Sequence, residues 1–405
     1  MKPKEPAEVY AINRGRSGWT LSRRSLFSAA AAAAAAPKRA EAGVCTAMAY
    51  LGAAWSLAIS PNGRLLASGG GDPEPTIKLW SLPDGAFLKT LTGHSRGVQS
   101  LAVSPDGRLM ASESADALKL WSLPDGASLK TLTTNSAGLV SLAMSPDGRL
   151  LASIKDLSTI NLWSLPDGAL VKSISATVNM AALGVQSLAI SPDGRLLAAG
   201  SYTNPVIQLL SFPDGALLKT LTGPPVTDDN VLCIAISPGG RLLASAGIYG
   251  RIMLWSLPDG ALLKTLPGVL YGVNSLAISP DGRLLASGGS DSTIKLWSLP
   301  DGALVKSLTE PDEFVGSVAI TPDGRLLAAG SSDGTINLWS LPDGKQLPIC
   351  LMDPAEPCSK AVTYTIAGGT YTVPASSPIP TGATCTCNTV SGFCGGCPSV
   401  YYYPN

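Results

Sequence analysis

The sequence predicts an all-β fold, a ring of seven small antiparallel sheets, and three observations carry this prediction. One unit recurs seven times at spacings of 41 to 46 residues. Each unit contains four short apolar runs, and each run is too short for a helix. Pro-Asp-Gly segments, which reverse a chain sharply, join the first run to the second and the third to the fourth. The units begin at Ser56, Ser100, Ser141, Ser187, Cys233, Ser275 and Ser317.

The sixth unit shows how each strand follows from the residues. Its runs predict strands a to d at 273–279, 284–288, 293–298 and 303–308. Pro280-Asp281-Gly282 joins a to b, and Pro300-Asp301-Gly302 joins c to d. Proline presets one backbone angle, Asp caps the turn and Gly takes the positive φ that returns the chain. Each unit is therefore expected to be a four-stranded antiparallel meander.

A single sheet of this kind cannot bury both of its faces. Units packed face to face cover one another, and closing them into a ring leaves no open end. We therefore expect a seven-bladed β-propeller over residues 43–352. The outer strand of the last blade comes either from 345–352, which we favour, or from 44–48. If both contribute, Cys45 lies near Cys350 or Cys358, where a closure disulfide could form.

The units resemble the WD-repeat family in the Ser-Pro-Asp-Gly-Arg-Leu-Leu-Ala-Ser hairpin and the Ile-Lys-Leu-Trp of strand c. The resemblance spans Tyr50 to Met352 and implies a propeller that acts as a binding scaffold. There are departures from the family pattern: Gly93-His94 is the one Gly-His pair, Ser follows each Trp in place of Asp, and Leu210 replaces the fourth Trp. The family's Asp–His–Ser–Trp network is therefore not expected as a full set. The matching tryptophans are Trp80, Trp121, Trp163, Trp255, Trp297 and Trp339.

Residues 1–42 are predicted to be an export signal that is not part of the fold. A basic start leads to Ser22-Arg23-Arg24-Ser25-Leu26-Phe27, then to the apolar run 29–36, and then to Ala40-Glu41-Ala42, an A-x-A cleavage pattern. This order resembles a bacterial twin-arginine (Tat) signal, with the usual Phe-Leu pair swapped. The resemblance implies cleavage after Ala42 and a periplasmic or secreted protein. The alternative is a solvated basic patch beside an Ala-rich helix.

Composition excludes several classes of function. Hydrophobic residues make up 45% and charged residues 14%, which favours an ordered chain with a sizeable core. Lys+Arg and Asp+Glu balance at 29 each, so the basic excess of a nucleic-acid-binding protein is missing. No apolar run after the N-terminus reaches the length of about eighteen residues that a spanning helix needs. We expect neither nucleic acid nor a transmembrane helix in the cleaved chain.

The units differ in length only in their b–c and d–a connections, which lie on one face of an up-and-down meander. The opposite face is expected to be uniform. It carries one arginine per unit, each expected to pair with its own turn Asp: Arg64, Arg108, Arg149, Arg195, Arg241, Arg283 and Arg325. The varied face is expected to bind a protein or a cell-envelope partner, the alternative being neutral drift of unconstrained loops. The candidate residues are His94, Arg96, Tyr202, Asp228, Asp229, Tyr249, Arg251, Tyr271, Asp312, Glu313 and Phe314.

The residue inventory offers little for catalysis. His94 is the one histidine, and the resemblance gives that position a structural role in the family. No Walker A, GxGxxG or HExxH pattern occurs. Asp228-Asp229 and Asp312-Glu313 are expected to be solvated loop carboxylates. We therefore expect a scaffold that is not an enzyme and has no resident cofactor.

Residues 353–405 form a tail of different composition, and from 361 onward it carries no charged side chain. Its spacing C-x-C-x6-C-x2-C, at Cys385, Cys387, Cys394 and Cys397, is compact enough to hold zinc or an iron–sulfur centre. Disulfides formed in an oxidising compartment are the other interpretation, and we favour them. A metal or redox protein is thus the alternative function. Cys233, in a strand a, is expected to be an inert packed thiol.

Overall fold

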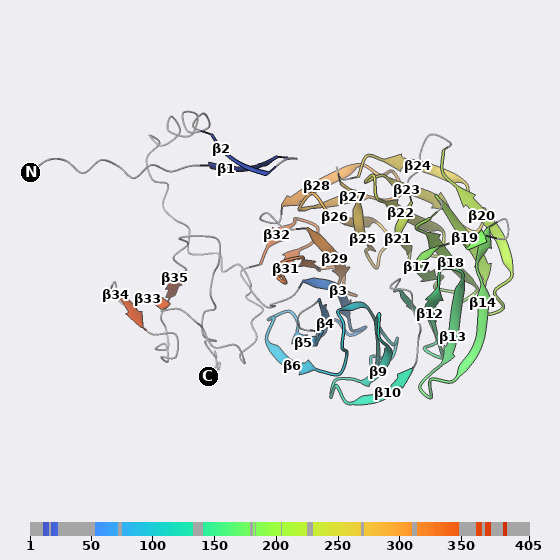
Figure 1. The fold of residues 1–405 in the computed structure, drawn as a ribbon, viewed down its shortest axis with the longest axis horizontal. Coiled ribbons are helices and arrows are strands. Elements are labelled where there is room, and N and C mark those ends of the chain that lie inside the picture. The colour runs from blue at the N-terminus through green and yellow to red at the C-terminus, as the bar shows by residue number, and fades with distance from the viewer. Residues whose placement is uncertain are drawn as a thin grey trace, which may run out of the picture. The chain divides into compact units, whose positions relative to one another are not determined.

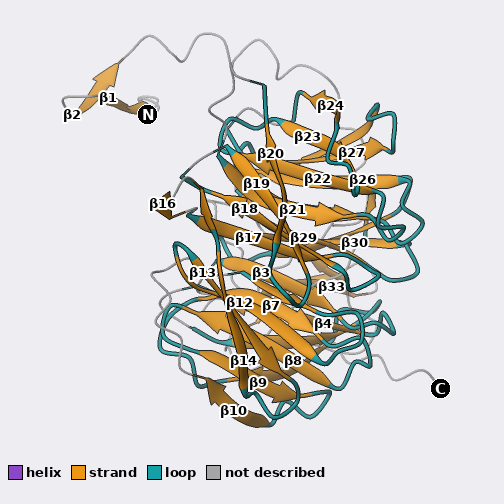
Figure 2. Cartoon of the chain, turned by 90° about the vertical axis from the view of Figure 1, so that its right-hand side faces the viewer, coloured by secondary structure: helices purple, strands orange, loops and turns teal. Residues whose placement is uncertain are grey.

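The computed structural model describes residues 53–347 except 72–74, 133–140, 179–180, 183, 204, 225–229, 269–270 and 310–313, and five short strands outside this range. The chain divides into two units, Met1–Val44 and Cys45–Asn405. In the first unit, β1 (Ala11–Gly15) pairs with β2 (Gly18–Ser22). In the second, β33 (Val362–Ile366) lies between β34 (Gly369–Val373) and β35 (Thr384–Thr386) in one small sheet. The described residues contain no helix (Figure 2).

Seven four-stranded antiparallel sheets follow one another along the chain, and we number them as blades 1 to 7 (Figure 1). Blade 1 contains β3 (Ala54–Ile59), β4 (Leu65–Gly70), β5 (Ile77–Ser81) and β6 (Phe87–Leu91). Blade 2 contains β7 (Val98–Val103), β8 (Leu109–Ser114), β9 (Leu118–Ser122) and β10 (Ser128–Leu132). Blade 3 contains β11 (Leu142–Met144), β12 (Leu150–Asp156), β13 (Thr159–Ser164) and β14 (Leu170–Ser175). A short hairpin of β15 (Thr177–Val178) and β16 (Ala181–Ala182) follows.

Blades 4 to 7 repeat the same order of strands. Blade 4 contains β17 (Val185–Ile190), β18 (Leu196–Ser201), β19 (Val206–Ser211) and β20 (Leu217–Thr222). Blade 5 contains β21 (Val231–Ile236), β22 (Leu242–Gly247), β23 (Ile252–Ser256) and β24 (Leu262–Leu266). Blade 6 contains β25 (Val273–Ile278), β26 (Leu284–Gly289), β27 (Thr293–Ser298) and β28 (Leu304–Thr309). Blade 7 contains β29 (Val315–Ile320), β30 (Leu326–Ser331), β31 (Ile336–Ser340) and β32 (Lys345–Gln346).

The blades close into a ring, as the sequence predicted. Strand β29 of the last blade packs against β3 of the first, and Figure 1 shows the two side by side. The Leu57 N–H donates to Ser317 Oγ across this junction at 3.2 Å. The same bond recurs between other neighbouring blades, for example from the Val318 N–H to Ser275 Oγ at 3.1 Å. The predicted circle of sheets is therefore confirmed.

The core lies between blades, because each sheet covers a face of the next. The tryptophan of strand c packs against the preceding blade: Trp80 of blade 1 joins a cluster with Ile336 and Leu338 of blade 7. Leu210, which replaces the tryptophan in blade 4, is also buried. Burial of such apolar surface is the main force that holds neighbouring sheets together.

The outer strand of blade 7 is supplied by the C-terminal side of the unit, as favoured. Residues Lys345 and Gln346 pair with β31, and the Leu347 N–H donates to the Leu338 carbonyl at 2.8 Å. Residues 348–352, the alternative segment 44–48, and Cys45, Cys350 and Cys358 lie outside the described residues, as do the export signal apart from β1 and β2 and most of the tail.

The turns of the uniform face also join neighbouring blades. The a–b turn glycines have positive φ angles, for example +70° at Gly107. A Cβ built on Gly107 would lie 3.6 Å from Pro61 Cδ, so this turn is in contact with the a–b turn of the preceding blade. At the c–d turns, a strand d lysine donates to the carbonyl of the next blade's turn Asp, from Lys89 to Asp125 at 2.6 Å. The other lysine–carbonyl pairs are Lys130–Asp167, Lys172–Asp214, Lys219–Asp259, Lys264–Asp301 and Lys306–Asp343.

Candidate binding surfaces

The exposed aromatic side chains gather on the varied loop face. Tyr202 (45% exposed) and Tyr249 (58%) follow the b strands of blades 4 and 5. Tyr271 (73%) and Phe314 (54%) precede the a strands of blades 6 and 7. We call these four residues the aromatic arc, because they lie in the loops of four neighbouring blades. Among the described residues, the one other exposed aromatic side chain is Trp55, at the start of strand a in blade 1.

The other predicted partner-binding residues have different settings. Arg96 is exposed in the loop before β7. Arg251 is partly buried, and its Nη1 atom has no hydrogen-bond partner. The remaining candidates fall outside the described residues: Asp228, Asp229, Asp312 and Glu313. The structure thus brings the tyrosines and Phe314 to one face and leaves the four loop carboxylates untested.

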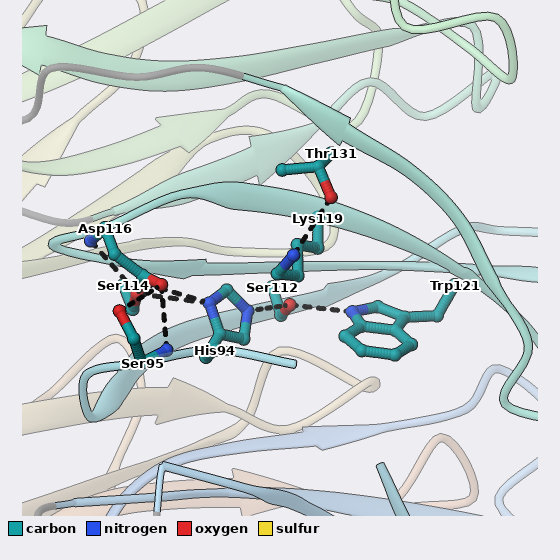
Figure 3. Close-up of polar contacts among 8 residues, drawn as sticks. All are labelled: His94, Ser95, Ser112, Ser114, Asp116, Lys119, Trp121 and Thr131. Atoms are coloured by element: carbon teal, nitrogen blue, oxygen red, sulfur yellow. Dashed lines mark hydrogen bonds and ion pairs between the residues drawn. The ribbon is translucent and has the colours of Figure 1, made fainter. Parts of the chain in front are cut away.

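His94 was expected among the exposed partner-binding residues of the varied face, and this expectation is wrong. The side chain is buried, and its Nε2 lies 2.7 Å from Ser112 Oγ, to which the Trp121 indole also donates at 2.8 Å (Figure 3). His94 Nδ1 lies 3.2 Å from Asp116 Oδ1. Because a carboxylate only accepts, Nδ1 carries the proton and Nε2 accepts the Ser112 hydroxyl. The imidazole is satisfied on both sides, so it has the structural role.

The complete Asp–His–Ser–Trp network forms in blade 2 alone among the described blades. In blades 1, 3, 5 and 6 the tryptophan indole still donates to its strand b serine, as from Trp297 to Ser287 at 3.0 Å. The b–c turn Asp then caps its own turn, as Asp291 does by accepting the Thr293 N–H at 3.1 Å. The prediction that this network does not form in all seven blades is confirmed. Blade 2 is the exception, because it contains all four residues of the network.

The expected pairing of each arginine with its turn Asp is wrong for the described turns. Asp106 accepts the Ser104 hydroxyl at 2.5 Å and the backbone N–H of Arg108 at 3.0 Å, and no arginine of this ring forms an ion pair in the described residues. The hydrogen bond from Ser104 is the main reason that the pKa of Asp106 is lowered. A short carboxylate reaches the backbone two residues on, whereas a long guanidinium would lose rotamer freedom to fold back.

Glu113 is an unusual buried residue that the sequence analysis missed. It lies in strand b of blade 2, has no exposed surface, and both carboxyl oxygens lack a hydrogen-bond partner. Burial raises its pKa well above the ordinary value of 4.5. Its register position holds glycine in four other blades, at Gly69, Gly200, Gly288 and Gly330. A Glu inside an otherwise apolar repeated strand was the signal that could have revealed it.

The ring encloses a cavity of about 380 Å³ that strand a residues of all seven blades line. The first residue of each unit contributes to a belt that is serine in every blade except blade 5, where it is Cys233. Cys233 is buried outside any disulfide, and its thiol donates to the Val273 carbonyl at 3.5 Å, as expected for a packed cysteine. The residue before the first residue of each unit varies from blade to blade. These varied lining residues, which the sequence analysis also missed, are Trp55, Gln99, Gln186, Leu232, Asn274 and Gly316.

No described residues form a group of three or more His, Cys, Asp or Glu side chains able to hold a metal ion. The tail cysteines Cys385, Cys387, Cys394 and Cys397 fall outside the search. No helix in the described part of the chain is long and apolar enough to cross a membrane.

A family model described as "WD domain, G-beta repeat" matches the chain seven times. The matches cover 46–81, 85–122, 126–164, 173–204, 215–256, 260–298 and 302–340. No curated protein matches the chain.

The buried histidine predicts a pH-dependent stability. Burial lowers the pKa of His94, and the hydrogen bond to Asp116 opposes this only in part. Below its usual pKa of 6.5 the unfolded chain takes up the proton more readily than the folded protein, so the unfolding free energy falls as the pH drops. His94→Gln should cost about 1–3 kcal/mol at pH ~8, and this cost should shrink toward pH ~5.

The histidine signal in an NMR titration can be assigned directly because the chain has one histidine. Its imidazole proton resonance should titrate below 6.5, in parallel with denaturant unfolding of both proteins. A midpoint at or above the ordinary value would contradict the structural role.

Glu113 predicts the opposite dependence of the unfolding free energy on pH. Because its pKa is raised in the folded state by burial, the folded protein holds a proton that the unfolded chain has already released. The unfolding free energy therefore falls as the pH rises above about 4.5. Glu113→Gln, which cannot ionise, should gain stability relative to the natural protein with rising pH, and Glu113→Gly should follow the same trend. A pH-independent difference in denaturant midpoint would refute a buried neutral carboxyl.

Proposed function

Because the chain belongs to the WD40 repeat family, we propose that it is a non-catalytic scaffold that holds a protein partner on its varied loop face. The aromatic arc carries this proposal. Tyr202, Tyr249, Tyr271 and Phe314 expose large rings on loops fixed by the ring of blades. Tyrosine and phenylalanine bury much area at little entropic cost, which is why they serve as anchors in interfaces.

The rest of the surface supports this choice of face. The rim also exposes apolar side chains, such as Leu129, Leu218 and Val305 of the d strands. These repeat from blade to blade, each beside a lysine that is tied to the next turn. A partner without sevenfold symmetry is recognised best by the surface that differs between blades. The arc is that surface, since it occupies the loops of blades 4 to 7.

We propose further that the protein works outside the cytoplasm and that its partner belongs to the cell envelope. The support is the order of the N-terminal features: Arg23-Arg24, the apolar run 29–36 and Ala40-Glu41-Ala42. A protein moved in folded form arrives with its loop face already assembled. Such a protein can bind as soon as it is released.

Position-specific cross-linking tests the partner-binding face. A photoreactive residue at Tyr249, Tyr271 or Phe314 should capture one and the same protein, while one at Leu218 on the rim or Arg195 on the uniform face should not. Alanine at Tyr271 should lower capture from Tyr249 about tenfold, the loss of about 1.4 kcal/mol that an interface anchor supplies. Equal capture from the rim and the uniform face would contradict the assignment.

Export is tested by the mature N-terminus. The protein recovered from the envelope fraction should begin directly after Ala42, and Arg23→Lys with Arg24→Lys should leave it uncleaved in the cytoplasm. The matched control is Arg14→Lys with Arg16→Lys, which keeps the same charge and should be exported normally. Normal export of the first variant would remove the twin-arginine proposal.

A further inference from the structure

The central cavity contains the most varied positions of the otherwise uniform a strands. The residue before the first residue of each unit is Trp55, Gln99, Gln186, Leu232, Asn274 or Gly316 in six blades. Each is the second residue of its strand a, which starts at a d–a loop, so this varied belt lies toward the loop end of the channel. Positions that vary inside a repeat while pointing into a cavity are candidates for recognition.

Trp55 forms an aromatic wall of this cavity. It is 44% exposed, whereas the strand c tryptophans are buried. Glycines flank it on two sides: a Cβ at Gly71 would lie 2.7 Å from its Nε1, and a Cβ at Gly316 would lie 3.3 Å from its Cε3. Gly316 occupies the same belt position in the neighbouring blade 7. The two positions are therefore complementary, and the missing side chain in blade 7 leaves room for the indole.

The polar groups of the belt are amides. Among the described residues, the Gln99 and Gln186 side chains have no hydrogen-bond partner, and the Trp55 indole N–H has no acceptor. Asn274 is held by its Nδ2, which donates to the Val315 carbonyl at 3.0 Å and to Ser290 Oγ at 3.1 Å. The belt serines below accept backbone N–H groups, as Ser187 does from Ile234 at 3.1 Å. None of the described lining residues carries a charge.

We propose that this channel mouth binds a sugar unit of a neutral carbohydrate. A sugar ring offers an apolar C–H face that stacks on an indole, and its hydroxyls both donate and accept. Amide side chains also do both, so Gln99 and Gln186 can satisfy several hydroxyls of one ring. An ionic ligand would lose its hydration without gaining a counter-charge. The volume of about 380 Å³ falls within the range of small-molecule sites.

A neutral peptide is the rival occupant, and the geometry favours the sugar. An extended peptide presents one amide per residue and directs successive groups to opposite sides. The amides of Gln99 in blade 2 and Gln186 in blade 4 line the same small cavity as the flat aromatic surface of Trp55. Hydroxyls clustered around one ring match that arrangement. The site shares no residue with the aromatic arc, so it stands apart from the proposed partner binding.

The test measures binding of cellotetraose, maltotetraose and N-acetylchitotetraose to the whole chain by calorimetry and by ligand-observed NMR. At least one should bind saturably with one-to-one stoichiometry. Trp55→Ala should weaken it at least tenfold, and Gln99→Ala with Gln186→Ala should do the same. Gly316→Val keeps the indole but crowds it, and should weaken binding as well. Tyr271→Ala is the matched control and should leave sugar affinity unchanged. Circular dichroism and unfolding midpoints establish that each variant is folded.

Several results would overturn the proposal. One is the absence of binding by any of the three sugars at about 10 mM, a concentration at which even weak sites are occupied. Another is an unchanged sugar affinity of the folded Trp55→Ala variant. Equal binding of the charged tetragalacturonate would also refute it, as would displacement of the sugar by a neutral Gly-Ser-Asn-Gly peptide at lower concentration. Failure here leaves cross-linking from the aromatic arc intact, so the two proposals fail separately.

Discussion

The structure depends on one constraint: every blade has two apolar faces and needs a neighbour on each. Blade 1 meets this need by placing Trp80 against Ile336 and Leu338 of blade 7, nearly the whole length of the array away in sequence. The hydrogen bond from Leu57 to Ser317 then satisfies a buried amide at the same junction. Closure is therefore a packing requirement first, and the polar contacts follow from it.

The contacts between blades lie in the uniform part of the unit. The belt serines, the turn glycines against prolines, and the lysine-to-carbonyl bonds involve strands a and d and the a–b and c–d turns. Few of them use the b–c and d–a loops. Those loops can change in length and composition at little cost to the ring. This separation explains how Tyr249, Tyr271 and Phe314 can be exposed on a scaffold whose other face barely changes.

Much of the fold could be predicted because the same pattern of strands and turns occurs in each of the seven units. Strand a of blade 6 runs Val273–Ile278 where 273–279 was expected, and the C-terminal outer strand of blade 7 was chosen correctly. The predicted pairing of each arginine with its turn Asp was wrong because Asp106 accepts hydrogen bonds from its own turn instead. Counting the charges in a sequence does not reveal this competition between the backbone and the guanidinium. The varied belt was missed because alternation shows which residues share a face but not that the face of strand a meets a cavity.

The candidate functional residues are those that break the sevenfold repetition. Serine and glycine recur because they maintain the ring, so they carry no information about a ligand. Trp55 opposite Gly316 is different, because a large residue in one blade is matched by an absent side chain in the next. Blade 2 shows the same departure in its polar interior: His94 completes a network on one face of strand b, and alternation directs Glu113 to the other. A symmetric scaffold can recognise an asymmetric ligand only through such positions where they are exposed, and the exposed ones include the varied belt of the channel mouth and the aromatic arc of blades 4 to 7.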